Sequence, residues 1–289
     1  MFELLMGNMF RSSGFVLLLT LILMVSLSAI VGALIVSLTT DFRNAAVQAN
    51  DAKALWLAEA GLQKAIWNLK TPSGSGGQGE NWTTTGVTET LGDGSYTVVA
   101  TRWDFALATN GASASATSTS GTNTPAKAID GSNLTYWESQ NVPTPALPQE
   151  ITISFPYKLT LNKVRFLVPS GSTNNRPRRY SWQVSSDGTT YTTVFNMLGS
   201  NNSSTDVTNT FSVALNPAAA NVNFLRLHVE RTGTGSSHVR IATLEAIGSK
   251  ITSTGTVNTQ TRSIERTLVA DDGSPENQKA YNEIDWKEI

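Results

Sequence analysis

The fold is decided near the start of the chain by residues 15–38, which read FVLLLTLILMVSLSAIVGALIVSL and contain no charged side chain. A helix rises about 1.5 Å per residue, so this stretch is long enough to cross a hydrocarbon layer about 30 Å thick. No proline interrupts the chain before Pro72. We therefore expect one helix over residues 15–70, with residues 15–38 in a membrane.

The second half of this helix, residues 39–70, keeps the helical period but becomes amphipathic. Its apolar residues follow the i, i+3, i+4 spacing of a buried stripe, at Leu55, Ala58, Leu62, Ile66 and Leu69. Charged side chains occupy the other side. One half of the helix suits lipid and the other half suits a protein surface, so we expect the second half to pack on a folded domain.

Three features around this helix resemble type IV pilins, and minor pilins of the PilX type in particular. A short polar leader, residues 1–14, ends in Arg-Ser-Ser-Gly, like a prepilin peptidase site cleaved between Gly14 and Phe15. The apolar segment starts at that junction, and LWLAEAGLQKA at residues 55–65 is similar to the AEAGL segment of those pilins. The resemblance implies other pilin subunits and the prepilin peptidase as partners. It also implies a precursor in the bacterial inner membrane and a mature subunit in an extracellular fibre or a periplasmic pseudopilus.

One position departs from the major pilins, which carry Glu at the fifth residue after the junction, where this chain has Leu19. In the family that Glu is thought to meet the free amine of a neighbouring subunit. A subunit without it is expected at or near the tip of the fibre. The alternative is a signal peptide or a plain membrane anchor, but a signal peptide has an apolar core of only about 7–15 residues.

Composition narrows the class of protein. The 289 residues include 21 basic and 22 acidic residues, so the net charge of −1 gives no electrostatic signature of a nucleic-acid partner. There is no cysteine and hence no disulfide framework or thiolate metal site. The length favours two domains.

Beyond the helix the chain is predicted to be β-rich in two parts. Residues 71–106 and 249–289 are expected to form the pilin sheet, with a strand at 95–103 and a hairpin over 251–270 that turns near Asn258. Residues 107–248 show strand patterns at 150–155, 161–168, 180–185 and 224–229 and no long helical period. We predict an α+β pilin, with a long N-terminal helix and a small antiparallel sheet, that carries an inserted all-β jelly-roll sandwich.

The inserted residues 107–248 resemble the discoidin, or coagulation-factor type C, family of galactose-binding-like jelly rolls. The resemblance rests on several motifs in the family's order: KAIDGSNLTYWES at 127–139, ITISF at 151–155, SDGTTY at 186–191, FLRL at 224–227 and IATLEAIG at 241–248. It implies a module that binds carbohydrate. From the residues alone, Asp130-Gly131 is a turn and Trp137 a core residue.

The resemblance also implies a calcium site in the loop that contains Asp130. Carried over by position, the ligands would be Lys127, Asp130, Ser132, Thr135, Ala242 and Thr243. The family carries Glu where this chain has Thr243. Because the charge of the ligand set tunes calcium affinity, a set with one carboxylate is expected to bind weakly.

Ligand binding in the resembling family uses loops at one end of the sandwich. Candidate residues here are Asn174, Asn175, Arg176 and Arg178. Amide and guanidinium groups offer directional donors to sugar hydroxyls. A solvated basic turn is the alternative for Arg178. Because no catalytic motif accompanies the histidines, His228 and His238, we do not expect an enzyme.

The sequence therefore predicts a minor pilin or pseudopilin that presents a glycan-binding module at or near a fibre tip. The alternative is a purely structural priming subunit without a glycan ligand. An anchored hydrolase is a third class, disfavoured because no domain remains for catalysis.

Overall fold

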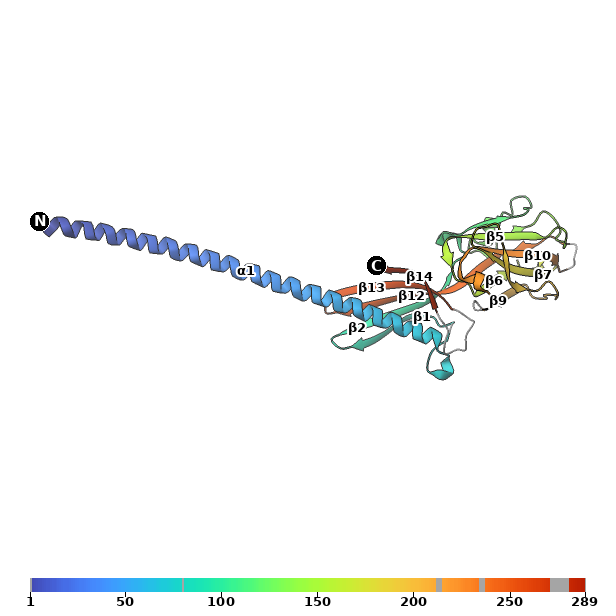
Figure 1. The fold of residues 1–289 in the computed structure, drawn as a ribbon, viewed down its shortest axis with the longest axis horizontal. Coiled ribbons are helices and arrows are strands. Elements are labelled where there is room, and N and C mark those ends of the chain that lie inside the picture. Colours follow the sequence, from blue (N-terminus) through green and yellow to red (C-terminus); the bar gives the residue numbers. More distant parts are fainter. Residues whose placement is uncertain (1, 80, 212–214, 234–236, 271–280, 289) are drawn as a thin grey trace.

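The computed structural model describes residues 2–79, 81–211, 215–233, 237–270 and 281–288, of which residues 2–13, 15, 269–270 and 281–288 are described by their backbone alone. A helix extends from one end of the molecule, a small sheet packs on its C-terminal half, and a sandwich follows at the other end (Figure 1). The helix, α1 (Phe2–Lys70), begins before residue 15, so the predicted leader, from residue 2 on, is part of it. It ends at Lys70, as predicted.

The N-terminal half of α1 is exposed on all sides. Within the described residues, one helical stretch, Val16–Lys70, is long and apolar enough to cross a membrane, and none of its apolar window is buried in the molecule. Leu17 and Met24, for example, are 74% and 70% exposed. By its length and composition, this exposed surface suits an apolar environment.

The C-terminal half of α1 buries its predicted stripe against a sheet. Ala58, Leu62, Ile66 and Leu69 are at most 8% exposed, and they pack on strand residues such as Val98. Two glycines permit the close approach. A Cβ on Gly61 would lie 2.5 Å from the Ser253 hydroxyl, and one on Gly255 would lie 2.0 Å from the Ala54 carbonyl oxygen. At Gly255 the sheet therefore lies against the backbone of the helix, and at Gly61 side chains of the sheet occupy the space that a larger residue would need.

This sheet, which we call the rod sheet, is antiparallel with the order β1-β2-β12-β13-β14. Its strands are β1 (Thr84–Leu91), β2 (Gly94–Asp104), β12 (Thr243–Val257), β13 (Gln260–Ala270) and β14 (Tyr281–Glu288). Only the part of β12 from Ile247 onward pairs with β2. The predicted hairpin is confirmed: β12 and β13 pair from Val257↔Gln260 onward, and Asn258 takes the positive φ of 54° that the tight turn needs. Residues 271–280 of the predicted segment lie outside the described residues.

The sandwich contains a five-stranded sheet in the order β3-β5-β10-β7-β8, faced by β6 and β9, which pair with the start of β12. A two-stranded ladder of β4 and β11 closes one end. The strands are β3 (Ser113–Ala116), β4 (Trp137–Glu138), β5 (Gln149–Leu159), β6 (Lys163–Leu167), β7 (Pro177–Ser185), β8 (Thr192–Asn196), β9 (Asp206–Thr210), β10 (Val222–Thr232) and β11 (Arg240–Ile241). Trp137, Tyr180 and Trp182 are fully buried in its core.

Strand β12 belongs to both parts of the molecule. Its first residues pair with β6 of the sandwich, and from Ile247 it pairs with β2 of the rod sheet. The chain leaves β2 at Asp104 and returns opposite it at Ile247, so the sandwich is inserted between two neighbouring strands. One strand thus crosses the predicted boundary at residue 248 without a break.

Charged side chains reinforce this junction. Glu245 of β12 accepts hydrogen bonds from Arg102 of β2 and from Arg165 of β6. Arg165 also holds Asp206 of β9 through two bonds of 2.6 and 2.7 Å. The chain of ion pairs links the rod sheet to both strands on the near side of the sandwich.

Candidate functional site

The loops at one end of the sandwich lie away from the rod sheet. Within the sandwich, β12 starts opposite Leu167 and reaches Val164 before it enters the rod sheet. The end of β6 is therefore the distal end. From it the chain passes through a short 3-10 helix, η4 (Thr173–Asn175), into β7, whose first residue pairs with the last residue of β10. These connections converge at the distal end.

A cluster of polar and aromatic side chains sits there on the β4–β11 ladder. Glu138 is opposite Arg240, and its Oε1 accepts a bond of 2.8 Å from Arg240 Nε. The same carboxylate oxygen lies 3.8 Å from His238 Nδ1, and Oε2 accepts a bond of 3.1 Å from the Asn123 amide. Tyr136 adds a ring 5.3 Å from the Arg240 guanidinium. We call Tyr136, Glu138, His238 and Arg240 the distal cluster.

The side chains of the distal cluster differ in their exposure to solvent. The Glu138 side chain is 10% exposed, whereas those of Arg240 and His238 are 32% and 42% exposed. A buried carboxylate thus fixes the orientation of the accessible Arg240 side chain and lies close to the accessible His238 ring. Because Arg240 also lies near an aromatic ring, its guanidinium is held in place by two kinds of contact.

The four sequence-predicted ligand residues lie in or beside η4. Asn174 is exposed, and Asn175 donates a bond of 2.9 Å to the His238 carbonyl oxygen, which joins this loop to the distal cluster. Arg176 donates to the carbonyl oxygens of residues 173 and 202, and Arg178 to that of residue 233. The two guanidinium groups therefore spend some of their N–H donors on the backbone of neighbouring loops, which they hold together.

Three of the predicted calcium residues, Asp130, Ser132 and Thr135, form hydrogen bonds with one another. Asp130 Oδ1 accepts from the Ser132 backbone nitrogen at 2.8 Å, and its Oδ2 accepts from the Thr135 hydroxyl at 2.7 Å. Thr243, 8% exposed, donates a bond of 2.9 Å to Asn133 Oδ1. Within the described residues, no group of three or more His, Cys, Asp or Glu side chains could hold a metal. With a single carboxylate in the set, the donors do not fit a calcium ion well.

The other histidine, His228, lies on the outer face of the five-stranded sheet. Its Nδ1 is 2.7 Å from Glu150 Oε1 and its Nε2 is 3.5 Å from Glu230. The hydrogen bond to Glu150 raises the pKa of His228, partly opposed by burial. Arg226 pairs with Glu150 at 3.3 Å and stacks on Tyr191 at 3.4 Å. We interpret this group as a satisfied surface network.

Sequence reasoning did not select the distal cluster. Glu138 and Arg240 are about a hundred positions apart, and only the β4–β11 pairing brings them together. The available signals were weak: a charged residue directly after the core Trp137, and a histidine and an arginine flanking Val239, which is fully buried.

The part of the chain that carries this site is similar to a known domain family. Residues 112–244 match the F5/8 type C domain family, within the predicted segment 107–248, and the chain therefore carries a discoidin-like domain of this family. None of the curated proteins compared with the chain matches it.

Three solved structures illustrate the similarity. The CpGH89CBM32-5 module of Clostridium perfringens, in complex with GalNAc-β-1,3-galactose, is 26% identical with a TM-score of 0.40, over 47% of this chain and 94% of that one. The family 32 CBM of C. perfringens NanJ, in complex with galactose, is 20% identical with a TM-score of 0.42, over 51% and 99% of the two chains. Chitosan-binding module 1 of a Paenibacillus sp. IK-5 chitosanase/glucanase is 25% identical with a TM-score of 0.40, over 50% and 98%.

Proposed function

We propose that this protein binds carbohydrate through the distal cluster and displays that site at the end of a membrane-anchored rod. The position of the cluster is the observation that carries the proposal. It lies at the end of the F5/8 type C domain that is remote from the rod sheet, while the exposed apolar helix occupies the opposite end of the molecule (Figure 1). The site is thus the part of the molecule presented farthest from a membrane.

The chemistry of the distal cluster suits a sugar. The guanidinium of Arg240 and the imidazole of His238 are accessible, and the hydrogen bond to Glu138 orients Arg240. Sugar hydroxyls accept such directional hydrogen bonds. The Tyr136 ring offers an apolar surface to the C–H groups of a pyranose. We place the exposed Asn174 at the edge of this site, with Asn175, Arg176 and Arg178 holding the loop that carries it.

The rod supports a finer proposal, that of a minor pilin or pseudopilin of a type IV pilus-like fibre. Cleavage between Gly14 and Phe15 by the prepilin peptidase would leave α1 as the N-terminal helix of the mature protein. Partners would be other pilin subunits, and the location would change from the inner membrane to an extracellular fibre or a periplasmic pseudopilus. Leu19 supports a place at or near the tip, because an unpaired amine in an apolar layer is costly.

A purely structural priming subunit is the second candidate. It is favoured by Leu19 and by the ion pairs that fix the sandwich to the rod sheet, since both suit a subunit whose role is to start assembly. The carbohydrate-binding candidate requires a glycan ligand and the structural candidate does not, so a binding experiment distinguishes them.

The full chain, solubilised in a detergent without sugar groups, should bind a subset of glycans on an array. Binding of no glycan would favour the structural candidate. The pilin proposal is tested separately by N-terminal sequencing: the mature protein should begin at Phe15, and Gly14→Ala should prevent processing. Immunogold labelling would then show whether the protein sits at fibre tips, along shafts or only in the membrane.

A further inference from the structure

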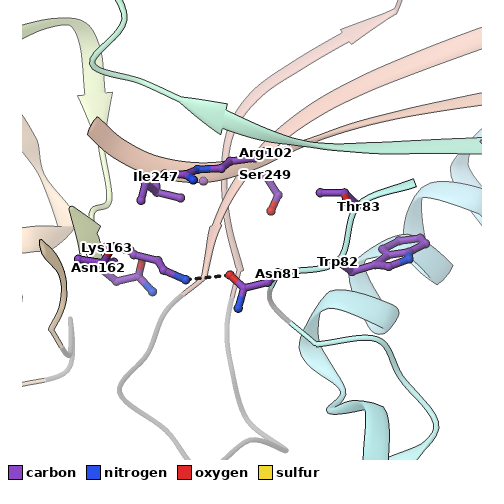
Figure 2. Close-up of a pocket in the computed structure, with 10 residues that line it drawn as sticks. Asn81, Trp82, Thr83, Arg102, Asn162, Lys163, Ile247 and Ser249 are labelled. Atoms are coloured by element: carbon purple, nitrogen blue, oxygen red, sulfur yellow. Dashed lines mark hydrogen bonds between the residues drawn. The ribbon is translucent and has the colours of Figure 1, made fainter. Parts of the chain in front are cut away.

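A hollow lies at the junction between the rod sheet and the sandwich, and its lining includes no residue of the distal cluster (Figure 2). Its volume is about 490 Å³. Small-molecule sites typically range from about 300 to 1,000 Å³, so this hollow, the junction cavity, could accommodate a ligand of one or two sugar rings. Its walls are formed by Asn81, Trp82, Thr83, Arg102, Asn162, Lys163, Thr208, Ile247, Gly248 and Ser249.

Three separate parts of the chain build the junction cavity. The rod sheet contributes Arg102 and Ser249, which are paired across β2 and β12. The sandwich contributes the start of β6 and the middle of β9. The segment before β1 forms a third wall, where Trp82 packs against the core under α1. A ligand in this cavity would therefore touch the rod and the sandwich at once.

The junction cavity contains polar side chains without partners. The residue Asn162 is only 3% exposed as a whole, and it belongs to the cavity wall, where its side-chain amide has no hydrogen-bond partner among the described residues. The hydroxyl groups of Thr83, Thr208 and Ser249 likewise have no partner in the described part of the chain. These side chains line the cavity, so their amide and hydroxyl groups are available to a polar group from outside the protein.

The hydrogen-bonding properties of these side chains indicate which kind of ligand the junction cavity could bind. Hydroxyl and amide side chains both donate and accept hydrogen bonds, which matches the hydroxyl groups of a sugar. The cations in the wall are already engaged, since Lys163 donates a bond of 2.9 Å to Asn81 and Arg102 pairs with Glu245. The described lining includes no carboxylate. A neutral ligand therefore fits better than a metal ion or an anion.

We propose that the junction cavity is a second saccharide site that takes a neutral monosaccharide or disaccharide unit. Asn162, Thr208 and Ser249 bind its hydroxyl groups, and Ile247 contacts its apolar face. The proposal does not depend on the distal cluster, because the two sites share no residue. A sugar bound here would stabilise the orientation of the sandwich relative to the rod.

The test uses the full chain in a detergent without sugar groups, in an Arg240→Ala background that disables the distal cluster. Galactose, N-acetylgalactosamine, glucose and N-acetylglucosamine serve as probes in ligand-observed NMR titrations. Thr208→Trp fills the cavity from an exposed edge strand, and Thr210→Trp, two positions along the same strand and outside the lining, is the matched control. We expect at least one probe to bind R240A and R240A/T210W equally, and R240A/T208W at least tenfold more weakly.

Equal binding by the two tryptophan variants, or no binding of any probe to R240A, would overturn the proposal. Asn162→Ala provides a second variant, with the same expected loss, should T208W fail to fold. The proposed function has a different readout, because it predicts a loss between the wild type and R240A. The experiments can therefore refute the junction cavity as a sugar site without refuting the distal cluster, and the reverse also holds.

Discussion

Asp104 and Ile247 face each other across β2 and β12 at the point where the chain leaves the rod sheet and returns to it. The Asp104 carboxylate clamps this crossing, because its Oδ1 accepts backbone hydrogen bonds of 2.9 Å from both Ala106 and Ala246. One half-buried side chain thus joins the outgoing and the returning strand.

The first prediction concerns the independence of the rod. The rod and the sandwich have separate cores, and β2 and β12 are adjacent where the sandwich begins. Replacing residues 105–246 with a hairpin loop of about four residues should therefore leave α1 packed on the rod sheet. Thermal unfolding by circular dichroism and limited proteolysis would check this. A variant that is unfolded would show that the sandwich is needed for the rod to fold.

The second prediction concerns pH. Burial raises the pKa of Asp104 to about 6, against the opposing effect of its two backbone hydrogen bonds. A carboxyl group whose pKa is higher in the folded state stabilises the fold at pH below about 4, and this contribution is lost as the pH rises to about 6. Asp104→Asn keeps an acceptor oxygen without the buried charge. It should be more stable than the wild type at pH 7 by an amount on the order of 2 kcal/mol.

Two comparisons make the Asp104 test specific. At pH 4 the advantage of Asp104→Asn should largely disappear, because the wild-type carboxyl group is then neutral in the folded state. Asp104→Ala removes the acceptor and should be destabilised at both pH values. If Asp104→Asn has the same stability difference at pH 4 and pH 7, the side chain is not titrating as described.

The third prediction concerns calcium. The predicted ligand set has one carboxylate, Asp130, and both of its oxygens already accept hydrogen bonds within the loop, so we expect calcium binding too weak for calcium or a chelator to change the melting temperature of the wild type. Thr243→Glu adds a second carboxylate to the set and should make the melting temperature rise with calcium. Thr243→Val should lose about 1 kcal/mol through the missing hydrogen bond to Asn133, without any response to calcium. A wild type that calcium stabilises would contradict this account.

Much of the fold could be predicted because its strongest signals are local. The segment without charges and the apolar stripe predicted the helix, and they placed its C-terminal end correctly. The alternation of apolar and polar residues predicted β2, the β12–β13 hairpin and four strands of the sandwich. Among the strands that alternation did not predict are β1, β3, β8 and β9. They are short or poor in large apolar residues, as in Ser-Ala-Ser-Ala at β3, and only their neighbours make them strands.

The site was less predictable because it depends on pairing between distant parts of the chain. Asn175 and Arg176 were selected by position in a loop, and the structure shows them bonded to the backbone of neighbouring loops. Glu138 and Arg240 come together only through the β4–β11 ladder. The junction cavity depends on where helix, rod sheet and sandwich meet, which no local pattern encodes.

The most direct test of the central claim is a titration of the full chain, in a detergent without sugar groups, with the glycan that binds best on the array. Arg240→Ala should weaken binding at least tenfold, because it removes an accessible donor that Glu138 holds in place. Arg231→Ala, which removes an exposed arginine near the end of β10, is the matched control and should bind like the wild type. Equal affinities of Arg240→Ala and Arg231→Ala would contradict the assignment of the distal cluster as the carbohydrate site.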